Sequence, residues 1–393
     1  MELPALTQEI LAAARDVEAQ VITWRRHFHA RPERGYQERC TSLIVMSQLK
    51  RLGIKVQSAA KTGVVGTINC RRPMETIAFR ADMDALAMDE ESDLPFKSKT
   101  PGVAHMCGHD AHTAMLLGTA SVLTRLQRYL KRRVKLIFQP SEESSPSGAQ
   151  AMVKAGVIRD VDEIFGLHVG SMIPNGTLFT RPGPMLAAMD GLKITVIGKG
   201  GHGASPHECV DPVPIAAEII TALQTVVSRK IKPVDAAVVS ICQVQAGTAA
   251  NIIPGTVRLV GTVRTLEERV RRRMPEMIGQ IVRGVAYAHG ATCEVNYSRG
   301  YPPVVNHPSS VARLSKAAAD LFGPKMKVDE MTPIMGSEDF CFYLEKTKGA
   351  IAMLGAGGKV KSARAPHHSP RFWIDESVLY QGPAVFSYLA LAE

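Results

Sequence analysis

Histidine and cysteine are concentrated in one short segment of the chain, HMCGHDAH at 105–112. Three histidines and one cysteine occupy these eight positions, and only Gly108 separates Cys107 from His109. Thiolate and imidazole are ligands of zinc and neighbouring transition metals, whereas calcium and magnesium prefer oxygen. Any one of these side chains, taken alone, is better explained as a residue that lines the start of a helix. Taken together, they predict a metal site.

Further metal-ligand residue types stand where strands of a sheet are expected to end. They are Asp82 and Asp84 at the end of strand 76–82, Glu142 and Glu143 after strand 134–140, and His168 in strand 163–169. Ligands bind at the carboxyl ends of the strands in open parallel sheets. Because adjacent carboxylates repel unless a cation compensates them, we expect zinc, manganese, cobalt or nickel at this edge. The pair Glu142–Glu143 alone is typical of a charged surface. Its place between a buried strand and the loop SSPSG favours a role in the metal site instead.

The pattern of apolar residues predicts an α/β protein with two domains. The expected elements of the first part are helices over 5–30, 40–52 and 109–130 and buried strands over 76–82, 134–140 and 163–169. Helices that alternate with apolar strands are typical of a mostly parallel sheet covered by helices on both faces. A length of 393 residues is enough for more than one hydrophobic core.

The middle of the chain has a different pattern, strand-helix-strand-strand-helix-strand, which is typical of ferredoxin-like α+β domains. Asp211 and Pro212 predict the start of its first helix. The segments KITVIGK (193–199) and AAVVSICQVQ (236–245) alternate apolar and polar residues, as edge strands do. We therefore predict a discontinuous catalytic domain over 1–185 and 301–393, with an inserted domain over 186–300.

Composition excludes several classes of protein. The net charge of +10 comes largely from KRR (131–133) and RVRRR (269–273), which lack interleaved aromatic residues and favour solvated helix faces over nucleic-acid binding. No apolar run is long enough to cross a bilayer. The seven cysteines show no paired spacing and the N-terminus lacks the features of a signal peptide, which predicts a protein of the reducing cytoplasm.

A set of motifs in order along nearly the whole chain resembles the dinuclear-metal amidohydrolases, a family that includes hippurate hydrolase, N-acyl-amino-acid amidohydrolases, auxin-conjugate hydrolases and related carboxypeptidases. The motifs are RADMDAL (80–86), HMCGHDAHTAMLLG (105–118), FQPSEE (138–143), GLHV (166–169), GKGGHGASPH (198–207), DPV (211–213), GTAANIIPGTVRLVGTVRT (247–265), MGSEDF (335–340) and HHSPRF (367–372). The resemblance implies a metal-bearing catalytic domain with an inserted dimerisation domain.

The resemblance also implies a role for each candidate residue. Two divalent ions would be held by Cys107, His109, Glu143, His168 and His368, with Cys107 as a bridging thiolate. His367 is the alternative to His368, but the family's histidine directly precedes Ser-Pro or Asn-Pro, which favours His368. Glu142 would be the general base, which takes a proton from the attacking water and returns one to the leaving amine. Asp84 matches an acidic position that supports the ligands.

In the inserted domain, the resemblance makes His202 a donor to the developing oxyanion, and Asn251 and Arg264 binders of a substrate carboxylate. From the residues alone, Arg264 is equally well explained as a surface strand residue. The glycines around His202 predict either a close backbone approach or a mobile hinge. Departures from the family pattern at SSPSGAQ, Ala87 and HGAS (202–205) leave the substrate preference open.

These observations predict a homodimeric, two-metal hydrolase of the amide bond of N-acyl amino acids. A carboxypeptidase that acts on small or N-blocked peptides with the same residues is the alternative within the enzyme class. A metal-binding protein that has lost catalysis is the alternative outside it, and the presence of Glu142 beside the ligand residues argues against that.

Overall fold

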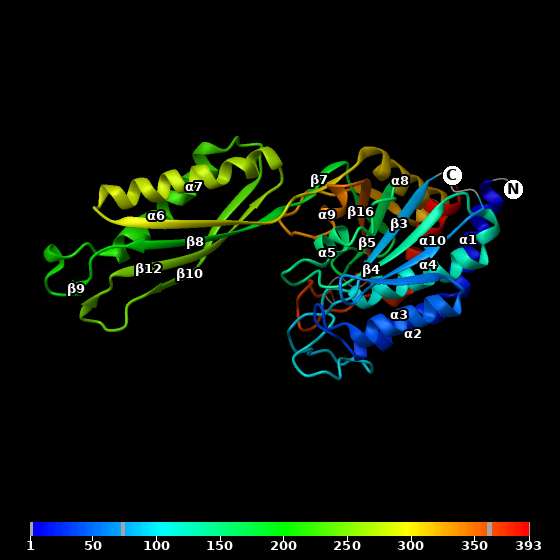
Figure 1. Ribbon diagram of the computed structural model, residues 1–393. Helices are drawn as coiled ribbons and strands as arrows, with labels where there is room; N and C mark the ends of the chain where they lie inside the picture. The colour runs from blue at the N-terminus through cyan, green and yellow to red at the C-terminus, as the bar shows by residue number, and fades with distance from the viewer. Residues whose placement is uncertain (1–2, 72–74, 360–363, 393) are drawn as a thin grey trace. The chain divides into compact units, whose positions relative to one another are not determined.

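The computed structural model describes residues 3–71, 75–359 and 364–392. The chain divides into two compact units (Figure 1). The first consists of Met1–Gly183, Val305–Met331 and Phe342–Glu393, and the second of Pro184–Val304 and Thr332–Cys341. The second unit thus takes in a segment that follows the predicted insertion of 186–300. This segment joins the second unit by local pairing, because the N–H of Ala187 donates to the carbonyl of Gly336 and Leu186 forms a bridge with Ile334.

The first unit is built on an eight-stranded sheet in the order β1-β2-β4-β3-β5-β16-β6-β15. At its centre β3 is parallel to β4 and β5, and β5 is parallel to β16. The strands are β1 (Lys55–Ala59), β2 (Gly63–Ile68), β3 (Thr76–Asp82), β4 (Arg133–Gln139), β5 (Glu163–Gly170), β6 (Thr177–Thr180), β15 (Lys327–Glu330) and β16 (Lys348–Gly355). The carboxyl ends of these parallel central strands therefore meet at one edge, as predicted.

Helices cover this sheet, and the predicted fold class is confirmed. They are α1 (Leu3–Asp16), α2 (Glu18–Ala30), α3 (Arg39–Arg51), α4 (His109–Arg125), α5 (Gly148–Lys154), α8 (Pro308–Phe322), α9 (Cys341–Leu344) and α10 (Gln381–Leu391). The helix expected over 5–30 is two helices that break at Val17, and the one expected over 109–130 ends at Arg125. In the part of the chain that the structure describes, no helix is both long and apolar enough to span a membrane.

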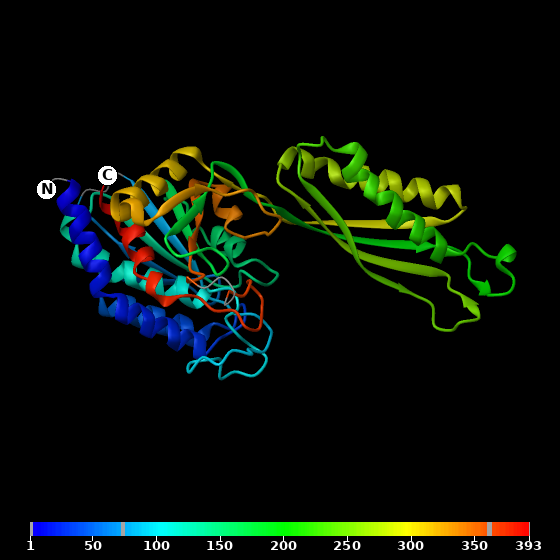
Figure 2. The ribbon, with the colours of Figure 1, turned by 180° about the vertical axis from the view of Figure 1, so that it is seen from behind.

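The second unit has the predicted ferredoxin-like order of elements around an antiparallel sheet, β10-β12-β8-β13. Both of its helices cover the same face of this sheet (Figures 1 and 2) and share one hydrophobic core with it. The elements are β8 (Ala188–Ile197), α6 (Pro212–Thr225), β10 (Ala237–Ala246), β12 (Thr256–Thr265), α7 (Glu268–Ala288) and β13 (Thr292–Tyr301), and short strands β7 (Gly183–Leu186) and β14 (Val304–Asn306) stand at the ends of the insertion. The Asp211 carboxylate caps α6 by accepting from the N–H of Val213.

One of the two expected edge strands is not an edge. β8, which contains residues 193–197 of the expected strand 193–199, lies between β12 and β13, whereas β10 is an edge as predicted. β8 alternates because only one face of the sheet is covered by helices, so its partly exposed side chains point to the open face. A small ribbon of β9 (Gly201–His202) and β11 (Ile252–Ile253) extends beyond the sheet.

Candidate metal centre

Two sets of donor atoms converge at the carboxyl edge of the central strands in the first unit. Cys107, His109 and His168 offer ligand atoms that all lie within 4.8 Å of one another. Cys107, Glu143 and His368 form a second set of the same compactness. The two sets share only Cys107, which is the arrangement that a thiolate bridging two ions requires.

The distances inside these sets suit a transition metal. The sulfur of Cys107 lies 3.6 Å from Nε2 of His168, and a tetrahedral ion with ordinary Zn–S and Zn–N bonds separates its sulfur and nitrogen ligands by about 3.6 Å. Nδ1 of His109 lies 2.9 Å from the carbonyl oxygen of Asp84 and donates to it, which leaves Nε2 as the ring nitrogen that can bind a metal ion. That Nε2 atom is buried and has no hydrogen-bond partner among the described residues. A buried ring nitrogen that has no hydrogen-bond partner and lies beside a thiol fits a metal ligand.

Asp84 holds three of the candidate residues in place. Its side chain is buried at the end of β3 and accepts from the backbone N–H groups of Glu142, at 2.9 Å, and Glu143, at 3.0 Å. Its carbonyl oxygen accepts from His109. The single aspartate predicted to support the ligands thus orients both glutamates and one histidine.

Asp82, to which the family resemblance assigns no role, holds the end of β5 through His112. The Asp82 carboxylate accepts from Nδ1 of His112 at 2.6 Å, and Nε2 of His112 accepts from the N–H of Val169 at 2.9 Å. Burial raises the pKa of Asp82, but the charges of Arg80 and His109 oppose it and keep that pKa well below its usual range. Because both ring nitrogens of His112 are engaged, this histidine positions the strand that carries His168 and is no ligand.

The raised pKa of the Cys107 thiol indicates that a thiolate here needs a nearby cation. Burial raises the pKa of its thiol well above the usual range, and the neighbouring Glu143 carboxylate raises it further. A thiolate at neutral pH therefore depends on a positive charge in this site, and a bound metal ion supplies such a charge.

Gly108 explains how Cys107 and His109 can both face the site. Its φ of 93° lies in the left-handed region, and a Cβ atom there would stand 2.3 Å from Cγ2 of Val169. Only glycine satisfies both conditions, so the turn before α4 requires it. His368, with a φ of 63°, and Ser141 just before Glu142, with a φ of 48°, also adopt this uncommon conformation.

Both members of the His367–His368 pair border the site. Nε2 of His368 lies 3.1 Å from Oε1 of Glu143. Nδ1 of His367 lies 3.5 Å from the sulfur of Cys107, and its Nε2 accepts from the N–H of Ser171 at 3.4 Å. Burial, followed by the charge of His168, lowers the pKa of His367 to about 2, so its ring is neutral. His368 completes a donor set with Cys107 and Glu143. His367 contacts the sulfur of Cys107 but belongs to neither donor set.

A buried network beneath α4 escaped the sequence interpretation. The Asp110 carboxylate accepts from Nε of Arg25 at 3.0 Å and from Nδ1 of His29 at 2.8 Å, both from α2. Nε2 of His29 in turn lies 3.1 Å from Glu90. Because Asp110 follows His109 directly, this network fixes the first turn of α4 and the ligand on it. The sequence feature that could have indicated this network is the presence of Arg25 and His29 on the apolar face of helix α2.

In the second unit, His202 and Asn251 lie together but Arg264 does not join them. His202 stands on β9, opposite Ile252 of β11, and the N–H of Gly203 donates to the carbonyl of Asn251 at 2.8 Å. A Cβ at Gly200 would stand 2.6 Å from the carbonyl oxygen of Ile253, so these glycines serve a close backbone approach. Arg264 lies eight positions along β12 from Thr256, about 26 Å at the rise of a strand. A small substrate cannot contact all three residues of one chain.

Arg264 is nevertheless suited to an anion. Its Nη1 donates to the hydroxyl of Thr262 and lies 3.5 Å from the carbonyl of Val263. No carboxylate of the described residues forms an ion pair with it. Burial lowers the pKa of Arg264 from its high ordinary value, and the guanidinium remains charged at neutral pH.

Known proteins resemble this chain over nearly all of its length. The family model for peptidase family M20/M25/M40 matches residues 78–392. Thermostable carboxypeptidase 2 of Saccharolobus solfataricus is 40% identical over 390 residues, which are 98% of each chain. The N-acyl-L-amino acid amidohydrolase of Geobacillus stearothermophilus is 44% identical over 301 residues, 76% of this chain and 81% of that protein.

A solved structure resembles the whole fold. The crystal structure of a dinuclear metal-binding peptidase of the M20 family from Bacillus subtilis matches with a TM-score of 0.85 and 35% identity, covering 96% of this chain and 98% of that one. The resemblance predicted from the motifs is confirmed. The chain belongs to peptidase family M20/M25/M40 and is a hydrolase.

Proposed function

We propose that this protein hydrolyses the amide bond of N-acyl amino acids with two divalent ions, one held by Cys107, His109 and His168 and the other by Cys107, Glu143 and His368. The observation that carries the proposal is that two compact donor sets share a single thiol. Zinc, manganese, cobalt or nickel suits this mixture of thiolate, imidazole and carboxylate.

Glu142 is the general base in this proposal. Its carboxylate lies within 4.8 Å of donor atoms of His109 and Glu143, and its backbone is held by Asp84. The ions, when bound, polarise the scissile carbonyl and activate water. Glu142 accepts the proton of the attacking water and delivers it to the nitrogen of the leaving amine.

His202 serves as the donor to the developing oxyanion. Nδ1 of His202 lies 3.1 Å from the N–H of Ala204 and accepts from it, so the neutral ring carries its proton on Nε2. That exposed N–H is available to a substrate oxygen. Donors aimed at the place where charge develops lower the barrier more than they improve substrate binding.

A homodimer through the inserted domain reconciles the separation of His202 from Arg264. A substrate that meets His202 and Asn251 of one chain meets Arg264 of another only if a site is shared between subunits. The exposed edge of β10 offers a surface for a twofold contact, since unpaired strand edges associate readily. We further propose that the enzyme works in the cytoplasm, because all seven cysteines are free and a bridging thiol needs a reducing compartment.

The names of the relatives support acylated amino acids as substrates. They also support one alternative activity, that of a carboxypeptidase. An amidohydrolase of N-acyl-L-amino acids and a thermostable carboxypeptidase are both similar to this chain. The same residues can cleave the terminal peptide bond of a small or N-blocked peptide, and this is the second candidate function.

A substrate panel tests the proposal. The protein is stripped with a chelator, reloaded separately with zinc, manganese, cobalt or nickel, and assayed on N-acetyl and N-benzoyl amino acids and on N-blocked dipeptides. We expect metal-dependent hydrolysis, with a higher kcat/KM for N-acyl amino acids than for dipeptides. Preference for dipeptides would favour the carboxypeptidase, and inactivity with every metal on every substrate would contradict both.

A further inference from the structure

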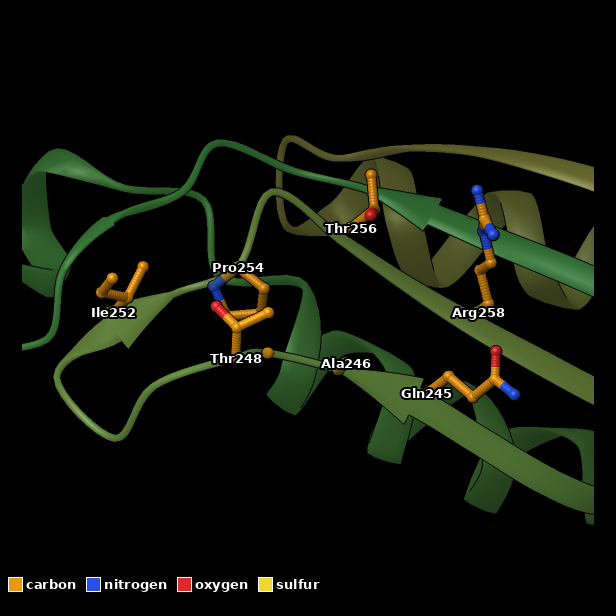
Figure 3. Close-up of a pocket in the computed structure, with 8 residues that line it drawn as sticks. Gln245, Ala246, Thr248, Ile252, Pro254, Thr256 and Arg258 are labelled. Carbon is orange, nitrogen blue, oxygen red and sulfur yellow. The ribbon is translucent and has the colours of Figure 1, made fainter.

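A cavity of about 330 Å³ opens in the second unit between the end of β10 and the start of β12. Figure 3 shows its lining, with Ile252 and Pro254 at one end and Gln245 and Arg258 at the other. Its volume lies at the lower end of the range of roughly 300–1,000 Å³ that is usual for ligand pockets. Among the residues that the structure describes, no acidic side chain lines it.

The end of the cavity near β11 is apolar. Ile252 is 53% exposed, although the size and chemistry of its side chain favour burial. Pro254, Ala246 and Thr248 line the same space. A single exposed isoleucine is unremarkable on a convex surface, but one that lines a concave wall beside other apolar groups can cover an apolar ligand.

The register of the β9–β11 ribbon sets this apolar wall beside His202. Ile252 and His202 are direct partners in the antiparallel pair. Side chains of directly opposed residues project from the same face of the ribbon, with their Cβ atoms about 5 Å apart. A group that receives a hydrogen bond from His202 therefore has the Ile252 wall within side-chain reach.

We propose that this cavity is the acyl subsite and that it binds apolar acyl groups of several carbons. The inference rests on the proposed role of His202, because the oxygen that His202 contacts belongs to the carbonyl of the acyl group. The carbon chain attached to that carbonyl begins at the carbon bonded to this oxygen, so we assign it to the wall beside Ile252, and we assign the carboxylate at the other end of the substrate to Asn251 and Arg264. An acetyl group is too short to reach the wall, so the subsite discriminates by acyl length.

The test compares acyl length at a constant amino acid. Wild type, Ile252→Val, Ile252→Ala and the control Val234→Ala are assayed on N-acetyl, N-hexanoyl and N-octanoyl derivatives of one amino acid. Val234 is an exposed apolar residue of the second unit that precedes β10 and does not line the cavity. We expect Ile252→Ala to lower the ratio of kcat/KM for octanoyl over acetyl substrate by about tenfold, mainly through KM, with Ile252→Val intermediate and Val234→Ala within about twofold of wild type.

Three results would overturn the inference. The octanoyl-to-acetyl ratio could stay unchanged in Ile252→Ala, or, on a second panel of N-octanoyl derivatives of different amino acids, the preference among amino-acid side chains could change in its place. Alternatively, Ile252→Ala could lower kcat/KM equally for all substrates while light scattering shows loss of the oligomer. That result would make the cavity a subunit contact. If reloaded wild type hydrolyses none of the N-acyl amino acids, the proposed function fails together with the subsite; if it hydrolyses them with an unchanged ratio, only the subsite fails.

Discussion

At the scale of single residues, two adjacent glutamates receive different roles from one aspartate. Asp84 accepts from both of their N–H groups, which fixes the backbone that carries the two side chains. Oε1 of Glu143 lies 3.1 Å from His368 in one donor set, whereas Glu142 lies beside His109 and Glu143. Burial raises the pKa of Glu143, but His368 and His109 lower it by a larger amount, so the net shift is downward. This carboxylate is therefore ionised, as a metal ligand requires.

Exchanging each glutamate for glutamine separates these roles. Glu142→Gln should keep its metal but lose a factor of about 10²–10⁴ in kcat, because it removes the proton carrier alone. Glu143→Gln should bind metal more weakly, because it removes a charged ligand. Elemental analysis alongside steady-state kinetics measures both, and the opposite pattern would exchange the two assignments.

Asp84→Asn tests the positioning of both glutamates. The amide offers one oxygen where the carboxylate offers two, so one of the two N–H groups loses its acceptor. We expect metal affinity to fall about 10–100-fold, as is usual when a residue that orients ligands is replaced. Competition with a chromogenic chelator measures the affinity, and unchanged affinity with normal kcat would show that Asp84 is dispensable.

At the scale of elements, one buried aspartate joins the strands and the longer helix of the second unit. Asp190 of β8 accepts from Nε and Nη2 of Arg271 on α7, from the hydroxyl of Tyr297 and from the N–H of Gly300 on β13. Burial raises the pKa of Asp190, but the hydrogen bonds from Arg271 and Tyr297 lower it by more. A carboxyl with a lowered pKa stabilises the fold above its unfolded pKa and loses this contribution as the pH falls through its folded pKa.

Asp190→Ala should therefore destabilise the second unit in a pH-dependent way. Removing one partner of a buried ion pair leaves Arg271 with the longer ion pair to Glu268, at 3.5 Å, and costs about 3 kcal/mol. The deficit should be constant from neutral pH down to about pH 5 and shrink below about pH 4, as the wild-type carboxyl becomes protonated. Hydrogen exchange of the β8 and β13 amides measures this loss of unfolding free energy relative to wild type. A loss that grows on acidification would contradict the linkage to the Asp190 carboxyl.

The sequence predicted the elements of the site better than their arrangement. Cys107, His109 and the glutamate pair lie within short motifs, so their proximity follows from local spacing and the shared edge of the sheet. The contacts of Asp110 with Arg25 and His29 span more than eighty residues, and no local pattern encodes them. The alternation of β8 shows that one face of its sheet is covered, but it does not distinguish a central from an edge strand.

At the scale of the whole molecule, the separation of His202 from Arg264 within one chain predicts sites shared between subunits. Mixing inactive His202→Ala chains with inactive Glu142→Gln chains should restore partial activity, because one site of each mixed dimer carries both native residues. Arg264→Ala should raise KM without changing metal content. Light scattering must first show a dimer that exchanges subunits, and absence of recovery in such a preparation would place His202 in the site of its own chain.

The account depends most on one thiol serving two ions. Metal content per chain, measured by elemental analysis after reloading, tests it with two variants. Wild type should bind two ions, His168→Ala should retain one because His168 belongs to one donor set, and Cys107→Ser should lose both because Cys107 belongs to each. Two ions retained in Cys107→Ser would contradict the shared thiolate and the mechanism built on it.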